Sequence, residues 1–138
     1  MIAYIDGIIT YQSPAVIHLE VNGLGYEVQI SLHTYSRIQG MQRCKLHTYL
    51  HIKEDAHTLY GFFEESEKHI FLQLLGVSGI GASTARMILS SVQPAEIQRA
   101  IVQENEKLLE SIKGIGAKTA KRIILELKDK MVKQQDKW

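Results

Sequence analysis

The stretch KGIGAKTAKR, residues 113–122, repeats a pattern that occurs earlier in the same chain. Residues 78–87 read SGIGASTARM, and segments 78–89 and 113–124 are identical at seven of twelve positions. Each copy places Gly-Ile-Gly between two apolar segments, and its glycines suit a tight turn that needs a positive φ and an uncovered backbone. The repeat predicts two helical hairpins in which the central isoleucine packs onto both helices.

Apolar residues recur at helical spacing on either side of both turns. We predict helices over residues 64–75, 82–91, 94–103, 106–112 and 117–132, so that the two turns follow Leu75 and Ile112. Acidic residues begin the first of these helices, as the helix dipole favours. Pro94 opens the third, at a position where its missing N–H costs nothing. The chain from residue 64 onward is therefore predicted to be entirely helical.

The first part of the chain has the period of strands. Residues 15–21, 24–30, 45–52 and 58–63 carry strand-like patterns, and Asn22-Gly23 is a strong signal for a hairpin turn. In the third of these segments Leu46, Leu50 and Ile52 share one face. About five short strands with tight turns predict a small closed barrel. The fold class is therefore α+β: a barrel of five to six strands over residues 1–63, in contact with a helical domain over residues 64–138.

The two glycine turns also predict a site for anions. The backbone N–H groups after each turn lie at the start of a helix, unpaired and at the positive end of its dipole, where phosphate binds readily. Basic residues outnumber acidic ones by eight to three over residues 113–138. The candidate DNA-binding residues are Gly79, Gly81, Ser83, Thr84, Gly114, Gly116, Lys118, Thr119, Lys121 and Arg122. Phosphate contacts of this kind do not read sequence, and they weaken steeply with salt.

Two acidic residues occupy a turn that a DNA-binding protein would be expected to keep neutral or basic. Glu54 and Asp55 follow Lys53 in KEDAHTLYGF, residues 53–62, between two strands. A simple polar turn is one interpretation, since Asp is common in β-turns. The other is that two projecting carboxylates repel phosphates and keep a duplex from running straight across the protein. Such a tip favours DNA whose strands part around it.

The motifs MIAYIDGII, VNGLGYEV, KEDAHTLYGF, SGIGASTARMIL and KGIGAKTAKRIILELKDK, in this order and spacing, resemble the RuvA family across the whole chain. The resemblance implies an OB-fold barrel followed by two helix-hairpin-helix motifs. It implies binding of four-way (Holliday) DNA junctions, which the RuvB ATPase then moves in recombination and repair. It also implies that Glu54 and Asp55 form an acidic pin flanked by the basic Lys53, at the centre of a homotetramer or of an octamer built from two tetramers.

Three features depart from the pattern of that family. Ala82 and Ser83 follow the first Gly-Ile-Gly where Pro and Lys are common, and Ala117 takes a place that is often basic. We therefore expect weaker electrostatic binding unless Lys113 or Lys121 compensates. The chain also stops at LKDKMVKQQDKW, without the third helical domain through which family members contact RuvB. The sequence is either a piece of a longer protein or lacks this domain, and if the domain is truly absent, DNA binding should survive and coupling to the RuvB hexamer should be weak or lost.

Other functions have less support in the residues. We expect a protein that is not catalytic by itself and has no cofactor and no metal site, because the histidines are scattered and Glu54 with Asp55 would hold Mg²⁺ poorly. A general duplex-binding helix-hairpin-helix module remains an alternative, and so does a protein-interaction scaffold. The single Cys44, the lack of a spanning apolar run and the lack of a basic leader predict a cytoplasmic protein without a membrane segment.

Overall fold

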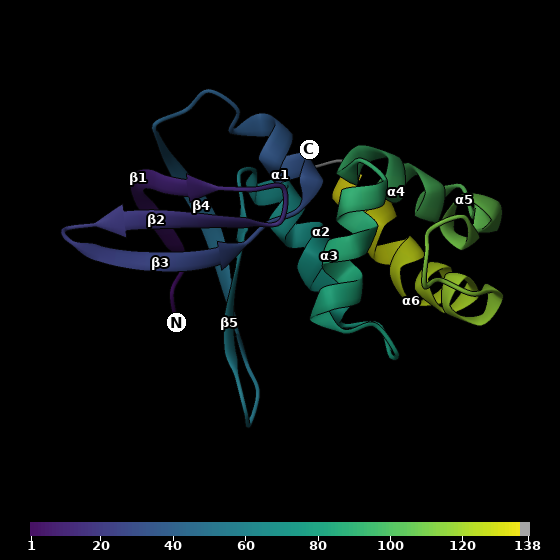
Figure 1. The fold of residues 1–138 in the computed structure, drawn as a ribbon. Helices are drawn as coiled ribbons and strands as arrows, with labels where there is room; N and C mark the ends of the chain where they lie inside the picture. The colour runs from purple at the N-terminus through teal and green to yellow at the C-terminus, as the bar shows by residue number, and fades with distance from the viewer. Residues whose placement is uncertain (136–138) are drawn as a thin grey trace. The chain divides into compact units, whose positions relative to one another are not determined.

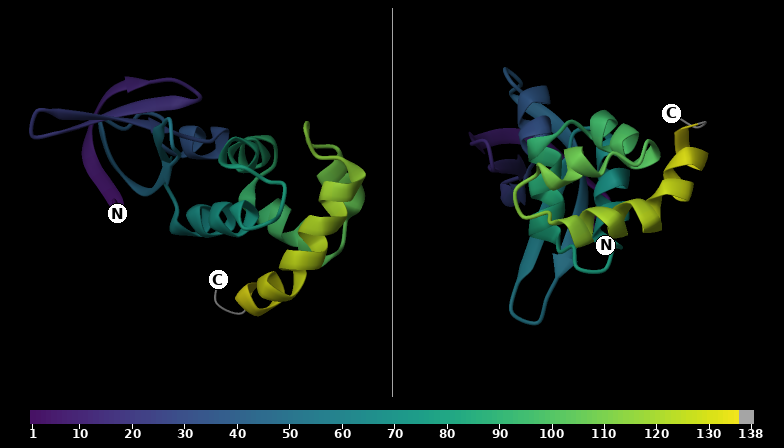
Figure 2. Two further views of the ribbon diagram at one scale, coloured as in Figure 1. Left: turned by 90° about the horizontal axis from the view of Figure 1, so that it is seen from below. Right: turned by 90° about the vertical axis from the view of Figure 1, so that its right-hand side faces the viewer.

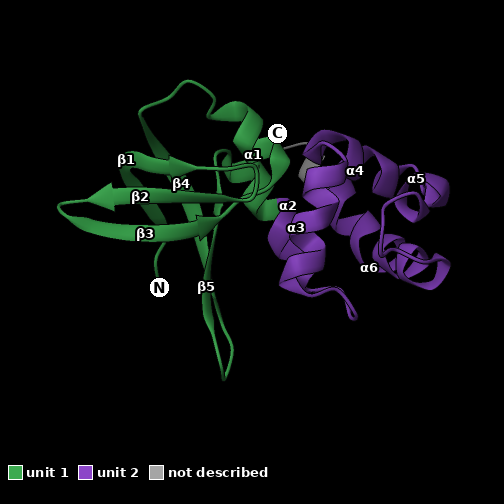
Figure 3. Ribbon diagram, in the orientation of Figure 1, with its two compact units in different colours: residues 1–69 green, residues 70–138 purple. Residues whose placement is uncertain are grey.

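The computed structural model describes residues 1–135, in which strands come first and helices follow (Figure 1). The elements in chain order are β1 (Tyr4–Gln12), β2 (Val16–Val21), β3 (Leu24–Gln29), α1 (Leu32–Arg37), β4 (Arg43–Ile52), β5 (His57–Phe62), α2 (Glu65–Leu75), α3 (Ala82–Ser91), α4 (Pro94–Val102), α5 (Glu106–Glu110) and α6 (Ala117–Gln135). They divide into two compact units, residues 1–69 and 70–138 (Figure 3). The predicted boundary after residue 63 lies between β5 and α2, and we retain it as a proposal.

The five strands form a closed barrel in the order β1-β2-β3-β5-β4. Neighbouring strands run antiparallel except β3 and β5, whose parallel pairing joins Val28 to Leu59 and Gln29 to Tyr60. Alternate side chains fill the interior, as the period of two requires. The buried core consists of Ile5, Ile17, Leu19, Val28, Ile30, Ile38, Cys44 and Leu46. The predicted small closed barrel is confirmed, with five strands.

The short helix α1 is absent from the sequence prediction. Ser31 begins it, because the Ser31 hydroxyl accepts a hydrogen bond from the Thr34 N–H at 3.1 Å and so satisfies an otherwise unpaired donor. The hydroxyls of Ser31 and Thr34 both donate to the buried carboxyl of Glu67 in α2, with 2.6 Å between Thr34 Oγ1 and Glu67 Oε1. This network joins α1 to the first turns of α2 within residues 1–69.

The predicted helices are confirmed with small shifts at their ends. The largest shift is at α6, which ends at Gln135 and not at residue 132, and α5 ends at Glu110 and not at Ile112. There the Ser111 N–H bonds to the carbonyls of both Lys107 and Leu108, and the Ile112 N–H bonds to the carbonyl three residues before it. This tightening ends the α-helix before the turn. The 19-residue α6 packs against α4 and α5 (Figure 2). No helix among the described residues is long and apolar enough to cross a membrane.

Candidate nucleic-acid interface

The two Gly-Ile-Gly turns have the same backbone geometry. The N–H of the central isoleucine donates to the carbonyl three residues before it, at 3.1 Å for Ile80 and 3.0 Å for Ile115. The first glycine has a φ of +92° at Gly79 and +91° at Gly114, which other residues rarely adopt. Both isoleucines are buried, with 5% of each exposed, and so fix the turns to the helices. The repeat in the sequence is therefore a repeat in the structure.

The second glycine of each turn has a different role. Gly81 precedes α3 with extended backbone, at a φ of −90°, and its carbonyl accepts from the Ala85 N–H at 3.0 Å. The Gly116 carbonyl accepts equivalently from the Ala120 N–H at 2.9 Å before α6. A Cβ added at Gly81 or Gly116 would meet no atom within 4 Å. The expected positive φ is thus found only at the first glycine of each turn, and the second leaves the backbone uncovered.

The first turns of α3 and α6 are suited to an anion. No side chain caps α3, and neither helix has an acidic residue in its first turn. Ser83 and Lys118 are exposed, while Thr84 and Thr119 are partly exposed beside the same backbone. Free N–H groups at the positive end of a helix dipole attract phosphate, and hydroxyl donors can add to them. Each turn can therefore hold one phosphate without a base contact.

The second turn carries more positive charge than the first. Its exposed basic residues are Lys113, Lys118, Lys121 and Arg122. The equivalent positions of the first turn are Ser78, Ser83, Arg86 and Met87. Arg86 is missing from the predicted set, although the alignment of the repeat pairs it with Lys121. The repeat itself was the signal that could have identified it.

Arg122 reaches from the second hairpin to the first. Its Nη1 atom lies 3.3 Å from the Ser78 carbonyl oxygen, to which it donates. The same nitrogen would be 3.7 Å from a Cβ added at Gly79. The structure therefore brings together predicted residues from both turns. The contact joins residues 44 positions apart, for which the sequence has no local signal.

The acidic residues lie at the tip of the β4–β5 hairpin, which extends beyond the barrel (Figure 1). The turn is closed by the Lys53 N–H, which donates to the Ala56 carbonyl at 2.8 Å. Lys53, Glu54 and Asp55 are all exposed. No ion pair found within residues 1–135 neutralises either carboxylate. The tip therefore presents two unpaired negative charges to anything that approaches it.

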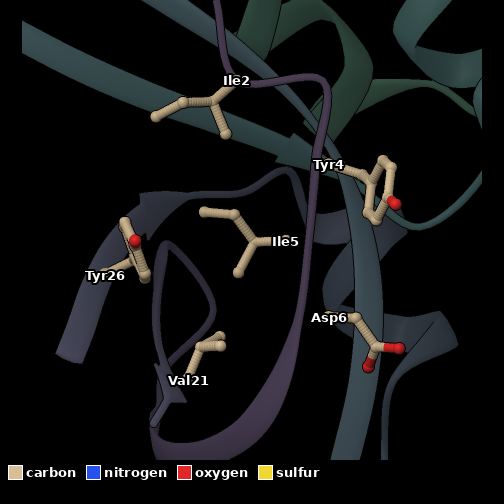
Figure 4. A pocket seen from close by; sticks show the side chains of 6 residues that line it. All are labelled: Ile2, Tyr4, Ile5, Asp6, Val21 and Tyr26. Atoms are coloured by element: carbon tan, nitrogen blue, oxygen red, sulfur yellow. The ribbon is translucent and has the colours of Figure 1, made fainter. Parts of the chain in front are cut away.

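A pocket of about 300 Å³ opens on the barrel beside β1 (Figure 4). It is lined by Ile2, Tyr4, Ile5, Asp6, Val21 and Tyr26. The carboxylate of Asp6 is ion-paired with Arg43, at 3.1 Å from the Arg43 Nε. In the part of the chain that the structure describes, no three His, Cys, Asp or Glu side chains come close enough to hold a metal ion. The pocket is an apolar hollow and does not gather a set of catalytic groups.

A closed barrel followed by two equivalent glycine hairpins defines a class of two-domain proteins with tandem helix-hairpin-helix motifs. Residues 1–61 match the family model described as the RuvA N terminal domain, and residues 71–129 match that of the SAM-like helix-hairpin-helix tandem. The predicted fold class is thereby confirmed. The chain belongs to the RuvA family, as comparison with curated proteins shows.

Several of these proteins are identical to this chain at about half of the aligned positions. The Holliday junction branch migration complex subunit RuvA of Cytophaga hutchinsonii is 53% identical over 133 residues, covering 96% of this chain and 67% of that protein. The protein of the same name from Bacteroides fragilis is 55% identical over 131 residues, covering 95% and 65%. That from Flavobacterium psychrophilum is 51% identical over 136 residues, covering 99% and 70%. This chain therefore spans about two thirds of the length of its relatives.

Proposed function

We propose that this chain binds four-way DNA junctions without reading their sequence and holds them open for branch migration. The observation that carries the proposal is the pair of equivalent turns, each ending at an open helix N-terminus. The relatives are named as RuvA subunits of a Holliday junction branch migration complex, which supports the same function here.

Each turn contributes phosphate contacts from a different combination of groups. The first uses the backbone at Gly79 and Gly81 with the hydroxyls of Ser83 and Thr84. The second uses the backbone at Gly114 and Gly116 with the Thr119 hydroxyl and the cations of Lys118, Lys121 and Arg122. Two turns in one unit can hold both strands of a duplex arm. Because phosphates are alike in every sequence, the affinity should not depend on the bases.

The acidic tip supplies the preference for branched DNA. Glu54 and Asp55 repel phosphates, so a continuous duplex across the tip is disfavoured, whereas strands that part around it are tolerated. Lys53 beside them can attract the nearest phosphate backbone. Four copies arranged as a homotetramer, or eight as two tetramers, would bind four arms at once and gain affinity through effective concentration. The chain itself would be non-catalytic and act in the cytoplasm, where the RuvB ATPase would supply the energy for movement.

The experiment is a competition between a labelled synthetic four-way junction and a linear duplex of equal length, with this 138-residue chain at two salt concentrations. We expect tight junction binding that weakens with salt and that excess duplex does not displace. Equal affinity for both DNAs would contradict the junction preference and leave a general duplex-binding module. No binding at either salt concentration would leave a scaffold whose hairpins only pack.

A further inference from the structure

One face of the β4–β5 hairpin remains apolar after the hairpin has left the barrel. Along β4, Leu46 lies in the barrel core, and the buried Thr48, then Leu50 and Ile52, follow on the same face at intervals of two. Burial decreases along this series: Leu46 is fully buried, Leu50 is partly buried and Ile52 is 57% exposed. The cross-strand partner of Ile52 is the exposed His57. The apolar face of β4 that points into the barrel therefore continues along the strand beyond the buried core.

Among residues 1–135, no third strand pairs with this end of the hairpin. β1 pairs with β4 only as far as Tyr4 and His47, and just beyond this pair the Thr48 N–H donates to the Ala3 carbonyl at 2.9 Å. β3 pairs with β5 only at Leu59 and Tyr60. Ile52 and His57 therefore belong to a bare two-stranded ribbon that ends in the acidic turn (Figures 1 and 2). Ile52 is 57% exposed there and does not belong to the barrel core.

We propose that Ile52 is a base-contacting wedge, whose side chain packs on the exposed face of a base pair beside the crossover of a bound junction, with His57 next to it. The inference rests on the proposed function. Where arms diverge from one point, the innermost base pair of each arm lacks a stacking neighbour on one side. Its face is flat and uncharged, and isoleucine is among the side chains that proteins insert against base steps.

The chemistry of the tip favours bases over other parts of DNA. Glu54 and Asp55 follow Ile52 within three residues and repel phosphate, but they leave an uncharged base face free to approach. An anionic tip and an apolar flank therefore select the same feature, an unstacked base pair away from its backbone. Isoleucine also favours strands in general. A test must therefore keep the branched shape of the side chain while removing its apolar surface.

The test uses Ile52→Thr, which keeps branching at Cβ, with Ile8→Thr as the matched control. Ile8 lies in β1 and is 50% exposed. The probe is a four-way junction with 2-aminopurine beside the crossover, and a second junction with the same base in the middle of one arm. Binding of the unmodified chain should raise the fluorescence of the first probe and not of the second, because the wedge covers the face of the reporting base and keeps it from stacking on the base pair across the crossover.

We expect Ile52→Thr to lose most of this rise and to bind the junction roughly tenfold more weakly, the order expected when the burial of one apolar side chain is lost. Its affinity for linear duplex should not change. Ile52→Val, which stays apolar, should keep most of the rise, and Ile8→Thr should match the unmodified chain.

An unchanged rise and unchanged affinity in Ile52→Thr would overturn the wedge. So would a change in assembled mass by light scattering, since Ile52 would then contact another copy of the chain. Failure of the proposed function is recognised separately, because the unmodified chain would then show no preference for the junction at all.

Discussion

The Arg122 guanidinium donates to the Ser78 carbonyl at 3.3 Å, so a side chain at the start of α6 is tied to the backbone of the other turn. Arginine has five N–H donors in a planar fork. One of them can hold Ser78 while others face a phosphate. Arg122 can therefore fix the position of one turn relative to the other as well as contribute charge.

Arg122→Lys keeps the charge but loses the planar fork. We expect DNA affinity to fall about fivefold, the order expected for the net contribution of one typical hydrogen bond. The slope of log affinity against log salt should stay nearly constant, because it counts neutralised phosphates. Fluorescence anisotropy at several salt concentrations measures both quantities. Lys121→Arg is the control for a change of cation alone. If Arg122→Lys bound DNA as tightly as the unmodified chain, the hydrogen bond between Arg122 and Ser78 would have no role in binding.

The two glycines of the second turn should respond differently to alanine. Gly114→Ala forces a side chain into a φ of +91°, so the free energy of unfolding should fall by about 1 kcal/mol or more. Gly116→Ala should leave it nearly unchanged, because an added Cβ there meets nothing within 4 Å. If the backbone at Gly116 approaches a phosphate closely, this stable variant should nonetheless bind DNA at least several-fold more weakly. Urea unfolding and junction binding on the same samples separate the two effects, and normal binding by Gly116→Ala would show that no close approach occurs there.

Removing the charge of the acidic tip should reduce selectivity. The double substitution Glu54→Gln and Asp55→Asn removes two exposed carboxylates and keeps their size. We expect affinity for linear duplex to rise several-fold while affinity for the junction changes less, since the repulsion acts mainly on continuous duplex. Competition assays at low salt measure the ratio best, because screening weakens the effect. The paired substitution Glu20→Gln and Glu27→Gln, elsewhere on the barrel, controls for net charge, and an unchanged duplex affinity in the tip variant would refute the role of the tip.

The buried Glu67 should make stability depend on pH. Burial raises the pKa of this carboxyl above its ordinary value of 4.5, although hydrogen bonds from Ser31 and Thr34 act in the opposite direction. Above pH 4.5 the folded chain then holds a proton that the unfolded chain has lost, so stability falls as the pH rises through the raised pKa. Glutamine does not titrate, so Glu67→Gln should not lose stability in this way. The free energy of unfolding of Glu67→Gln minus that of the unmodified chain should therefore increase as the pH rises from 4.5 through the raised pKa.

Urea unfolding from about pH 4 to about pH 8 measures the difference. The nearby contact between His33 and Glu64 is present in both proteins, so its contribution largely cancels in the comparison. Glu65→Gln is the control on the exposed side of the same helix. Parallel curves for Glu67→Gln and the unmodified chain would mean that Glu67 keeps an ordinary pKa.

Local patterns were sufficient to predict most of the fold. Alternation identified four of the five strands but did not place β1, and the repeated Gly-Ile-Gly identified both hairpins, because each signal lies within a few residues. The six-residue α1 was missed, since a helix of that length is too short to show a period of 3.6. Alternation also placed Ile52 on the same face as Leu46 but could not show that the strand runs past the barrel there. How deeply a side chain is buried depends on which strands pair around it, and the parallel pairing of β3 with β5 has no local signature in the sequence.

The candidate site was predicted less completely, for a related reason. Residue types and spacing located the turns and the acidic tip. They did not distinguish Gly79, which needs its positive φ, from Gly81, which does not. The tie between Arg122 and Ser78 depends on how the hairpins pack, so it could not be read from either copy of the repeat alone.

The bare end of the β4–β5 ribbon has a consequence for how this protein can evolve. Residues 53–56 contribute no side chain to the barrel core, so replacements there should change stability little. Their charge and the length of the turn can therefore vary while the fold is preserved. Selection can adjust which DNA shapes are accepted by altering a few codons at the tip, independently of the glycine turns that bind the arms. Grafting alternative tips onto this barrel is accordingly a practical route to proteins with new preferences for branched DNA.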